Sequence, residues 1–279
     1  MISPFSLSIV IVTHNSAVAL HALLPRLDLD AELIVSDNAS SDNVADLLRG
    51  RPARLLRNEG NIGYGAACNR AAAIATGEYL LFMNPDVEVT AATFAELKAA
   101  AARYPDAAVF VPRIEDRHGK PLVRDHNFVE RLQRDAWLRH PRRNVGDCCI
   151  HAIHGAMFMV RKSAFLAVGG FDEKIFLYYE DDDLAYRFTL LKQPIVYVDA
   201  ALAIHGEQES SETSVGRQVR MGFHKKRSEI YMRRKYGLGY GAGRDMIRNL
   251  ANVLFYLATF RFRRLFSALG RVRGIWSNP

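Results

Sequence analysis

The chain has 279 residues, of which 49% are hydrophobic and 24% charged, and it contains no low-complexity tract. These values are typical of an ordinary globular protein with one large or two small domains. The three cysteines, Cys68 and the adjacent pair Cys148 and Cys149, are an odd number without zinc-type spacing, which argues against a disulfide scaffold and for a reducing compartment.

The net charge of +7 is unevenly distributed along the chain. Residues 217–279 contain 15 Lys or Arg and only two acids, Glu229 and Asp245. The preceding 216 residues contain 22 basic and 28 acidic residues. A slightly acidic body with a strongly basic tail predicts an anionic partner for the tail alone.

Neither end of the chain resembles a membrane-spanning or export segment. No basic region precedes the first predicted strand, so we expect no signal peptide. The longest apolar run near the C-terminus, residues 250–260, is much shorter than the ~20 residues that span a bilayer. We therefore expect a cytoplasmic protein that is soluble or peripheral to the membrane.

Strands alternate with helices over the first 111 residues. Short β-branched or apolar runs predict strands at 7–13, 32–36, 53–57, 78–83 and 107–111. Between them, periodic patterns predict helices at 18–27, up to 49, up to 75 and at 90–103. This alternation indicates a doubly wound, mostly parallel sheet flanked by helices.

Polar residues follow four of these strands. They are His14-Asn15, Asp37-Asn38, the loop 61–65 and the turn 84–86. Each cluster alone is equally well explained by turn chemistry. Together they favour a ligand site, because ligands of such sheets bind at the carboxyl ends of the strands. The first turn lacks G-x-G-x-x-G, and no Walker A pattern occurs, which disfavours an ordinary dinucleotide or P-loop fold.

The second half of the body is less regular. Residues 112–149 are rich in arginine and include Phe128 and Trp137, so we expect either an insertion over the site or a solvated irregular segment. Further strands are predicted at 156–160 and 194–198, and the chain beyond Arg217 has a helical pattern.

Four consecutive acids, Glu180 to Asp183, begin a predicted helix. Mutual repulsion of their carboxylates argues against burial of the run. Acids at a helix N-terminus are also favoured by the free N–H groups and the macrodipole, so the run alone could simply decorate a solvated face.

Seven motifs, taken together, resemble the family 2 glycosyltransferases of GT-A fold, in particular the bacterial rhamnosyltransferase-like members. The motifs lie at 8–15, 35–42, 61–65, 81–86, 155–160, 169–173 and 180–184, and the resemblance covers about residues 7–206. It implies a catalytic domain at 1–210, with a nucleotide-sugar half at about 1–111 and an acceptor half at about 150–210. Residues 211–279 would then form a basic amphipathic helical extension.

The resemblance implies a nucleotide-sugar site at the first four strand ends. Asp37 would accept a hydrogen bond from N3–H of a pyrimidine base, which UDP- and dTDP-sugars share. The other nucleotide-sugar-binding residues would be Thr13, Asn15, Asn38, Asn61, Gly63, Tyr64 and Asn84.

The resemblance also implies a divalent metal, Mn²⁺ or Mg²⁺, on the diphosphate. Asp86 would be its carboxylate ligand, and His205 would complete the sphere or be only a turn residue. The sequence has Asn84-Pro85-Asp86 where the fuller pattern D-x-D has two carboxylates. A mixed His and carboxylate site would suit Mn²⁺ better than Mg²⁺.

By the same resemblance, Asp181 would be the general base of an inverting transfer and Glu180 its orienting neighbour. Asp182 lies one position away, so the register of the base within the run is ambiguous. Gly155, Asp172 and Tyr179 would contact the acceptor.

The predicted function is therefore an inverting glycosyltransferase. It would move a sugar, with rhamnose favoured, from a UDP- or dTDP-donor to a cell-surface glycan or lipid-linked acceptor. An apolar stripe with flanking arginines in the tail predicts docking on the inner membrane surface, or packing on the protein or in a homodimer. The alternatives are a nucleotidyltransferase and, less favoured, a nucleic-acid-binding protein; we expect no nucleic-acid partner.

Overall fold

The computed structural model describes residues 5–133, 146–206 and 215–277. The chain forms two compact units. The sheet unit comprises Met1–Glu173 and Glu180–Ser210, and the helical unit comprises Lys174–Tyr179 and Ser211–Pro279. Part of the arginine-rich segment lies outside the described residues, including Arg134, Trp137, Arg139, Arg142 and Arg143.

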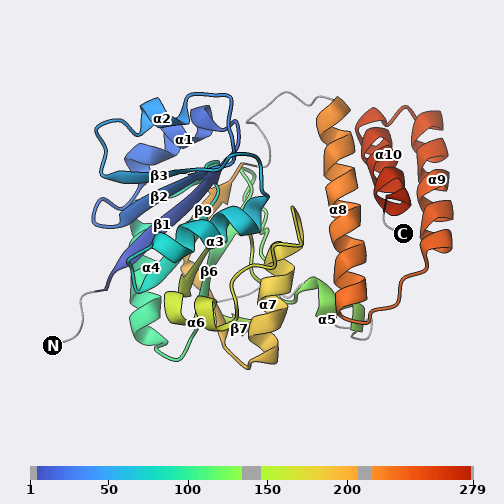
Figure 1. Cartoon of the computed structure of the whole chain (residues 1–279). Coiled ribbons are helices and arrows are strands. Elements are labelled where there is room, and N and C mark those ends of the chain that lie inside the picture. Colours follow the sequence, from blue (N-terminus) through green and yellow to red (C-terminus); the bar gives the residue numbers. More distant parts are fainter. Residues whose placement is uncertain (1–4, 134–145, 207–214, 278–279) are drawn as a thin grey trace. The chain divides into compact units, whose positions relative to one another are not determined.

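One mixed sheet forms the centre of the sheet unit (Figure 1). Its strands, among the described residues, are β1 Leu7–Thr13, β2 Glu32–Asp37, β3 Ala53–Arg57, β4 Tyr79–Met83, β5 Val87–Glu88, β6 Val109–Glu115, β7 Cys148–Ile150, β8 Met157–Arg161 and β9 Ile195–His205. They lie in the order β3-β2-β1-β4-β8-β6-β9-β5, and β7 also pairs with β9.

Helices cover both faces of this sheet because its strands are apolar on both faces. Successive residues of β1 point to opposite sides, so Ile9 and Ile11 join one core and Val10 and Val12 the other. The first core includes α1 Ala17–Leu23, α2 Val44–Leu47 and α4 Ala91–Arg103. The second includes α3 Tyr64–Ile74, α6 Lys162–Ala167 and α7 Glu180–Leu190.

The sheet confirms the predicted doubly wound arrangement and adds antiparallel pairs. Strands β3, β2, β1 and β4 run parallel to one another, as expected for strands joined by helices. Strand β8 runs antiparallel to both β4 and β6. The order reverses at β1, because β2 lies on one side of it and β4 on the other, which makes its carboxyl end the expected ligand crevice.

Strand β9 is longer than predicted and positions one candidate ligand. The sequence predicts a strand at 194–198, but β9 continues to His205 after a register shift in its partner β6 between Pro112 and Arg113. Its last residues pair with β5, and Val87 lies opposite His205. This pairing brings Asp86 next to His205.

The arginine-rich segment is partly regular where it is described. It contains the end of β6, the short helix α5 Phe128–Gln133 and β7. Phe128 and Val129 are buried, so this part is not a solvated irregular segment.

The helical unit contains α8 Val215–Lys235, α9 Ala242–Ala258 and α10 Phe262–Trp276, drawn in orange to red in Figure 1. Two glycines allow the backbones of α8 and α10 to approach closely. A Cβ atom at Gly222 would lie 2.1 Å from the Ser267 carbonyl oxygen, and one at Gly270 would lie 2.0 Å from the Val219 carbonyl oxygen. No described helix is long and apolar enough to cross a membrane.

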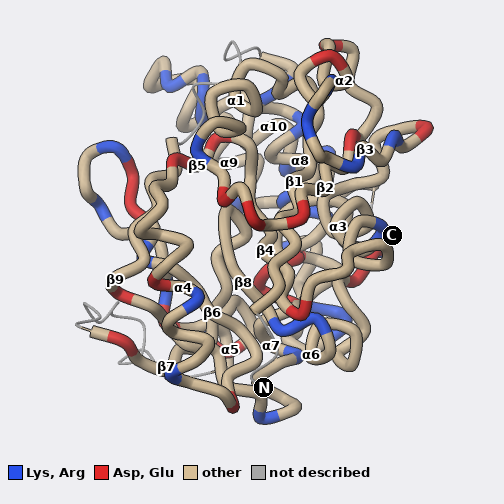
Figure 2. The backbone as a smooth tube through the Cα atoms, turned by 90° about the vertical axis from the view of Figure 1, so that its left-hand side faces the viewer, with Lys and Arg blue, Asp and Glu red and all other residues tan. Residues whose placement is uncertain are grey.

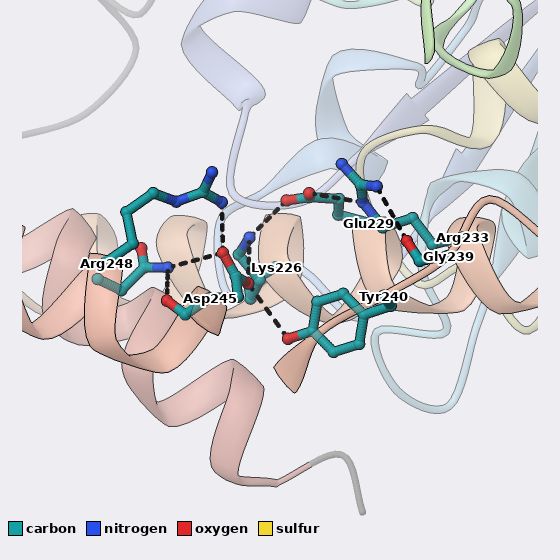
Figure 3. A network of polar contacts seen from close by, with 8 residues as sticks. Lys226, Glu229, Arg233, Gly239, Tyr240, Asp245 and Arg248 are labelled. Carbon is teal, nitrogen blue, oxygen red and sulfur yellow. Dashed lines mark hydrogen bonds and ion pairs between the residues drawn. The ribbon is translucent and has the colours of Figure 1, made fainter. Parts of the chain in front are cut away.

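A buried ion-pair network joins α8 to α9 (Figure 3). The Lys226 side chain is 3% exposed, and its Nζ donates to Asp245 Oδ2 at 3.0 Å and to Glu229 Oε2 at 2.6 Å. Asp245 also accepts hydrogen bonds from the Tyr240 hydroxyl and the Arg248 guanidinium. Burial opposes the shift, but hydrogen bonds and charge from Lys226 and Arg248 hold the pKa of Asp245 below its usual range.

We expect Lys226→Met to lower the free energy of unfolding by about 3 kcal/mol, because it leaves Asp245 buried beside fewer donors. Arg248→Met is the matched control, since Arg248 contacts the same carboxylate but its side chain is 67% exposed. Its cost should stay below ~1 kcal/mol. Urea unfolding followed by circular dichroism measures both, and equal effects would contradict the assigned role of Lys226.

Candidate active site

Hydrogen bonds join the loops that follow the first three strands. Asn38, after β2, donates from its amide to the Gly63 carbonyl at 3.1 Å and accepts from the Asn58 amide at 2.8 Å. The Asn38 backbone N–H donates to the Thr13 carbonyl, at the end of β1, at 2.8 Å. The predicted residues Thr13, Asn38 and Gly63 are thus held together at one edge of the sheet.

Asp37 lies at the centre of this edge and is 1% exposed. Its Oδ1 accepts hydrogen bonds from the Thr13 hydroxyl at 3.3 Å, the Ser40 amide at 3.1 Å and the Ser40 hydroxyl at 2.5 Å. Its Oδ2 lies 3.8 Å from Arg57 Nε. Oδ1 of Asp37 therefore holds the loop after β2 in place. Oδ2 faces the Arg57 guanidinium and can accept a further hydrogen bond.

The remaining polar residues of this edge are fixed mainly by backbone contacts. Asn15 has a φ of 54°, and its side chain accepts from the Ser41 amide at 2.8 Å. Asn61 accepts from the Gly63 amide at 3.1 Å. The Asn84 backbone N–H donates to the Ala156 carbonyl at 2.8 Å, which connects the end of β4 to the start of β8.

A second chain of contacts leads from this edge to the acidic run. The Tyr64 hydroxyl, at the start of α3, donates to the Gly155 carbonyl at 3.1 Å. The Gly155 amide donates to Asp181 Oδ2 at 2.9 Å. A Cβ atom at Gly155 would lie 3.2 Å from that oxygen, so glycine permits the close approach. Residues 64, 155 and 181, far apart in sequence, meet here.

The acidic run divides between the two sides of α7. Glu180 and Asp183, three positions apart and therefore on one face, are 7% and 0% exposed. The prediction that the run avoids burial is wrong for these two residues. Asp183 is compensated by Arg187, whose Nε donates to it at 2.8 Å, so burial does not leave its charge unpaired.

Asp181 and Asp182 are only partly buried. Asp181 Oδ1 accepts from the Asp182 amide at 2.9 Å. Asp182 Oδ1 accepts from the Phe128 amide at 2.5 Å and lies 3.6 Å from Arg131, so α5 holds this side chain. Burial and the charge of Asp181 raise the pKa of Asp182 to about 7. Figure 2 colours the Asp and Glu positions along the backbone red, and several of them lie around the labels β1, β2 and β5.

Glu180 is the most strongly perturbed acid of the run. Burial, followed by the negative charge of Asp181, raises the pKa of Glu180 to about 8. Its Oε2 is buried and has no hydrogen-bond partner among the described residues. Glu180 is therefore protonated at neutral pH, which leaves the negative charge of the run to its neighbours.

This pKa shift makes folding stability depend on pH. The folded chain keeps the Glu180 proton up to about pH 8, whereas the unfolded chain loses it near the ordinary value of 4.5. The contribution of protonated Glu180 to the free energy of unfolding is therefore complete below pH 4.5. It is lost as the pH rises towards 8, at a rate of at most ~1.4 kcal/mol per pH unit. We expect Glu180→Gln to make this decline less steep in urea unfolding measured from pH 5 to 8.5, and to remove the part above pH 7, because the raised pKa of Asp182 still causes a decline up to about pH 7. Glu59→Gln, at an exposed position, is the control, and a decline in Glu180→Gln as steep as that of the wild type would contradict the assignment.

Asp86 and His205, the two predicted metal ligands, lie side by side. His205 Nε2 is 3.4 Å from Asp86 Oδ1, and both side chains are partly exposed, at 17% and 26%. An imidazole and a carboxylate that face one another and remain open to solvent fit a divalent ion whose other ligands come from diphosphate and water.

His154 connects this pair to Asp181. Its ring packs edge-on against His205, with 5.9 Å between centroids. Burial lowers the pKa of His154 to about 4, and His205 adds to this effect while Asp181 opposes it. His154 is therefore neutral at physiological pH and lies beside His205 and near Asp181.

The three predicted acceptor residues have different local surroundings. Gly155 contacts Asp181, and Asp172 follows Phe171, whose amide and carbonyl are both bound by the Asn69 side chain. Tyr179 belongs to the segment that groups with the helical unit. Tyr178 and Tyr179 have φ values of 68° and 70°, and two such residues directly before Glu180 mark a strained entry to α7.

Sequence reasoning did not assign roles to Asn58, Arg70 and His154. Asn58 is buried and supports Asn38, and the Arg70 guanidinium donates to the Asn58 side chain at 2.9 Å. The position of Asn58 directly after β3, like that of Asp37 after β2, is the signal that could have identified it. His154 follows no predicted strand, and only the three-dimensional contacts reveal it.

Comparison with known proteins identifies the family of this chain. The profile described as "Glycosyl transferase family 2" matches residues 8–169. The chain belongs to this family. It is a family 2 glycosyltransferase, and the helices of the second unit lie beyond the matched residues.

Two curated relatives of this family 2 glycosyltransferase are named as rhamnosyltransferases. The N-acetylglucosaminyl-diphospho-decaprenol L-rhamnosyltransferase of Mycobacterium tuberculosis is 31% identical over 237 residues, which cover 74% of this chain and 77% of the relative. Rhamnosyltransferase WbbL of Escherichia coli is 27% identical over 251 residues, covering 81% and 92%.

A solved structure confirms the fold. The mannosyltransferase PcManGT of Pyrobaculum calidifontis, in complex with GDP-Man and Mn²⁺, superimposes with a TM-score of 0.62 at 14% identity. The match covers 98% of this chain and 88% of that one. The expected GT-A fold is therefore confirmed, with a helical C-terminal region.

Proposed function

We propose that this glycosyltransferase moves a sugar, with rhamnose as the first candidate, from a UDP- or dTDP-activated donor to a hydroxyl of a cell-surface glycan or lipid-linked acceptor. The two rhamnosyltransferase relatives support the sugar, and the name of the mycobacterial relative supports an acceptor attached through a diphosphate to a polyprenol. Neither relative favours a nucleotidyltransferase or a nucleic-acid-binding protein.

The donor nucleotide would bind across the loops after β1, β2 and β3. Asp37 Oδ2 is the acceptor for the pyrimidine N3–H, because Oδ1 already receives three hydrogen bonds from Thr13 and Ser40. Asn15, Asn38, Asn61 and the Gly63 backbone would form the walls of the nucleoside site. Tyr64 and Asn84 would connect this site to the sugar-transfer site, because Tyr64 contacts Gly155 and Asn84 contacts Ala156.

Asp86 and His205 would hold a divalent ion, with Mn²⁺ favoured over Mg²⁺ by the imidazole ligand. When bound, such an ion would neutralise charge on the departing diphosphate. The 3.4 Å contact between the two side chains supports this role.

Asp181 would act as the general base. Its carboxylate would take the proton of the acceptor hydroxyl as that oxygen bonds to the anomeric carbon and the bond from this carbon to the diphosphate oxygen breaks. The nucleoside diphosphate leaves, and a single in-line step inverts the anomeric configuration. The observation that carries this role is the 2.9 Å hydrogen bond from the Gly155 amide, which fixes the carboxylate at the end of the chain of contacts that begins at Tyr64.

Gly155, Asp172 and Tyr179 remain the proposed acceptor contacts, and the buried Glu180 would orient the base. The proton on Glu180 avoids a second negative charge directly beside Asp181.

The helical unit would bind the inner membrane surface, where a lipid-linked acceptor is available. In α9 the apolar residues Ile247, Leu250, Leu254 and Leu257 are 47–71% exposed. Arg244, Arg248 and Arg261 lie on or next to this helix, and each would add ~1 kcal/mol on an anionic surface. Co-sedimentation with phosphatidylglycerol vesicles tests this. Loss of binding in Leu250→Glu/Leu254→Glu supports it, and a homodimer that these changes dissociate in solution would assign the face to dimerisation.

The proposed reaction is tested by incubating the full chain with Mn²⁺, a polyprenyl-diphosphate N-acetylglucosamine acceptor and a panel of dTDP- and UDP-sugars. We expect dTDP-rhamnose to give a glycosylated lipid of inverted anomeric configuration, identified by mass spectrometry and NMR. Release of pyrophosphate from a nucleoside triphosphate and a sugar phosphate, without sugar transfer, would contradict the proposal.

A further inference from the structure

A second group of potential metal ligands lies outside the Asp86 and His205 pair. Among the described residues, His126, Glu130 and His151 each offer one ligand atom, and these atoms lie within 4.8 Å of one another. They come from the segment before α5, from α5 itself and from the residue after β7. None of them belongs to a motif that the transfer reaction uses.

Backbone contacts hold the three side chains in this arrangement. The His151 amide donates to the Asp125 carbonyl at 2.7 Å, and the Asn127 amide donates to the His151 carbonyl at 3.1 Å. The Asn127 side chain donates to the same carbonyl at 2.9 Å and accepts from the Glu130 amide at 3.1 Å. The two histidine rings lie edge to face, with centroids 5.6 Å apart. The site is therefore built on two cross-linked segments.

Glu130 is the observation that points to a ligand. Its side chain is 8% exposed, and Oε1 lies 2.7 Å from His151 Nδ1. Its second oxygen, Oε2, is buried and has no hydrogen-bond partner in the described part of the chain. A buried carboxylate with one oxygen unsatisfied is costly, and a cation bound beside it offsets that cost.

We propose that His126, Glu130 and His151 form a zinc site that is separate from the metal site of the transfer reaction. Two imidazoles and one carboxylate are a set that Zn²⁺ uses when a fourth position stays open to water. The 41% exposure of the His151 side chain leaves such a position towards solvent. Ligand atoms around tetrahedral zinc lie ~3.3 Å apart for bonds of ~2.0–2.1 Å, so small side-chain rotations close the site.

The bound ion would fix α5 against the acidic run. The Phe128 amide, two positions after His126, donates to Asp182 Oδ1 at 2.5 Å, and Arg131, next to Glu130, lies 3.6 Å from the same oxygen. Zinc would thus stabilise the helix that positions Asp182 beside the proposed base.

The test is calorimetric titration of Zn²⁺ into the full-length Asp86→Ala/His205→Ala variant, which removes the other metal pair. We expect one Zn²⁺ per chain and a rise in Tm of several degrees. In this background, His126→Ala, His151→Ala and Glu130→Gln should each weaken Zn²⁺ binding by at least ~10²-fold, since even outer-shell changes cost 10- to 100-fold. His118→Ala, at an exposed position outside the group, should leave it unchanged.

Both histidines are partly exposed and Gln matches Glu in size, so these variants should fold, which circular dichroism verifies. Substitution with Co²⁺ gives a second readout, because a four-coordinate site produces strong visible absorption that the variants should lack. Zn²⁺ binding that survives all three changes, that is lost in Cys149→Ser instead, or that is absent from the starting variant would overturn the proposal. None of these readouts depends on sugar transfer.

Discussion

Asp181→Asn is expected to lower the rate of sugar transfer by ~10²–10⁴-fold, the usual contribution of a general base. Asparagine keeps the size of the side chain and an oxygen that can accept from the Gly155 amide, so the site should keep its shape. It cannot take a proton from the acceptor hydroxyl. Affinity for the nucleoside diphosphate, measured by calorimetry, should therefore stay close to that of the wild type.

Asp182→Asn is the matched control for the register of the base. The Phe128 amide donates to Asp182 Oδ1, and Arg131 lies 3.6 Å from the same oxygen. These two contacts hold the Asp182 side chain in place. We expect a loss below ~10-fold, because geometry rather than proton transfer is affected. A large loss in Asp182→Asn with near-normal transfer in Asp181→Asn would move the base to the next residue.

Asp86→Ala is expected to lower transfer by ~10²–10³-fold and to remove stimulation by Mn²⁺, because charge stabilisation by a metal contributes several kcal/mol. His205→Ala removes the neutral ligand and should cost less, with a raised Mn²⁺ requirement. The measurement is transfer rate against Mn²⁺ concentration.

Glu88→Gln controls for charge near this site. Glu88 lies two residues after Asp86, on β5, and its carboxylate pairs with Arg26 and Arg117. It should retain near-normal Mn²⁺ stimulation. If Asp86→Ala keeps its Mn²⁺ response, the proposed metal site is wrong.

Much of the sheet could be predicted because its signals are local. A β-branched run predicted β1 and a short apolar run predicted β3, both at their observed bounds, and the predicted polar residues after β1, β2 and β4 lie at strand ends. The short strand β5 and the end of β9 were missed because neither has a periodic pattern of its own. They form by pairing with each other, which the sequence does not show.

The electrostatics of the acidic run were predicted less well for a related reason. Four adjacent carboxylates suggest exposure when only repulsion is considered. Arg187, one turn along α7, pairs with Asp183, and protonation of Glu180 removes another charge. The first effect is an i,i+4 pair within α7, whereas the second depends on what α7 packs against. His154 was likewise hidden, because its role arises from contacts with residues distant in sequence.

The proposed function depends most on one nucleotide-sugar site at the ends of β1, β2, β3 and β4. Calorimetric titration of UDP and dTDP into the wild type and Asp37→Asn, with and without Mn²⁺, tests it directly. The account predicts binding of at least one nucleotide that Mn²⁺ strengthens and that Asp37→Asn weakens by ~10-fold or more, as expected for a lost hydrogen bond to a charged group. Absence of binding, or binding that depends on neither Asp37 nor Mn²⁺, would contradict it.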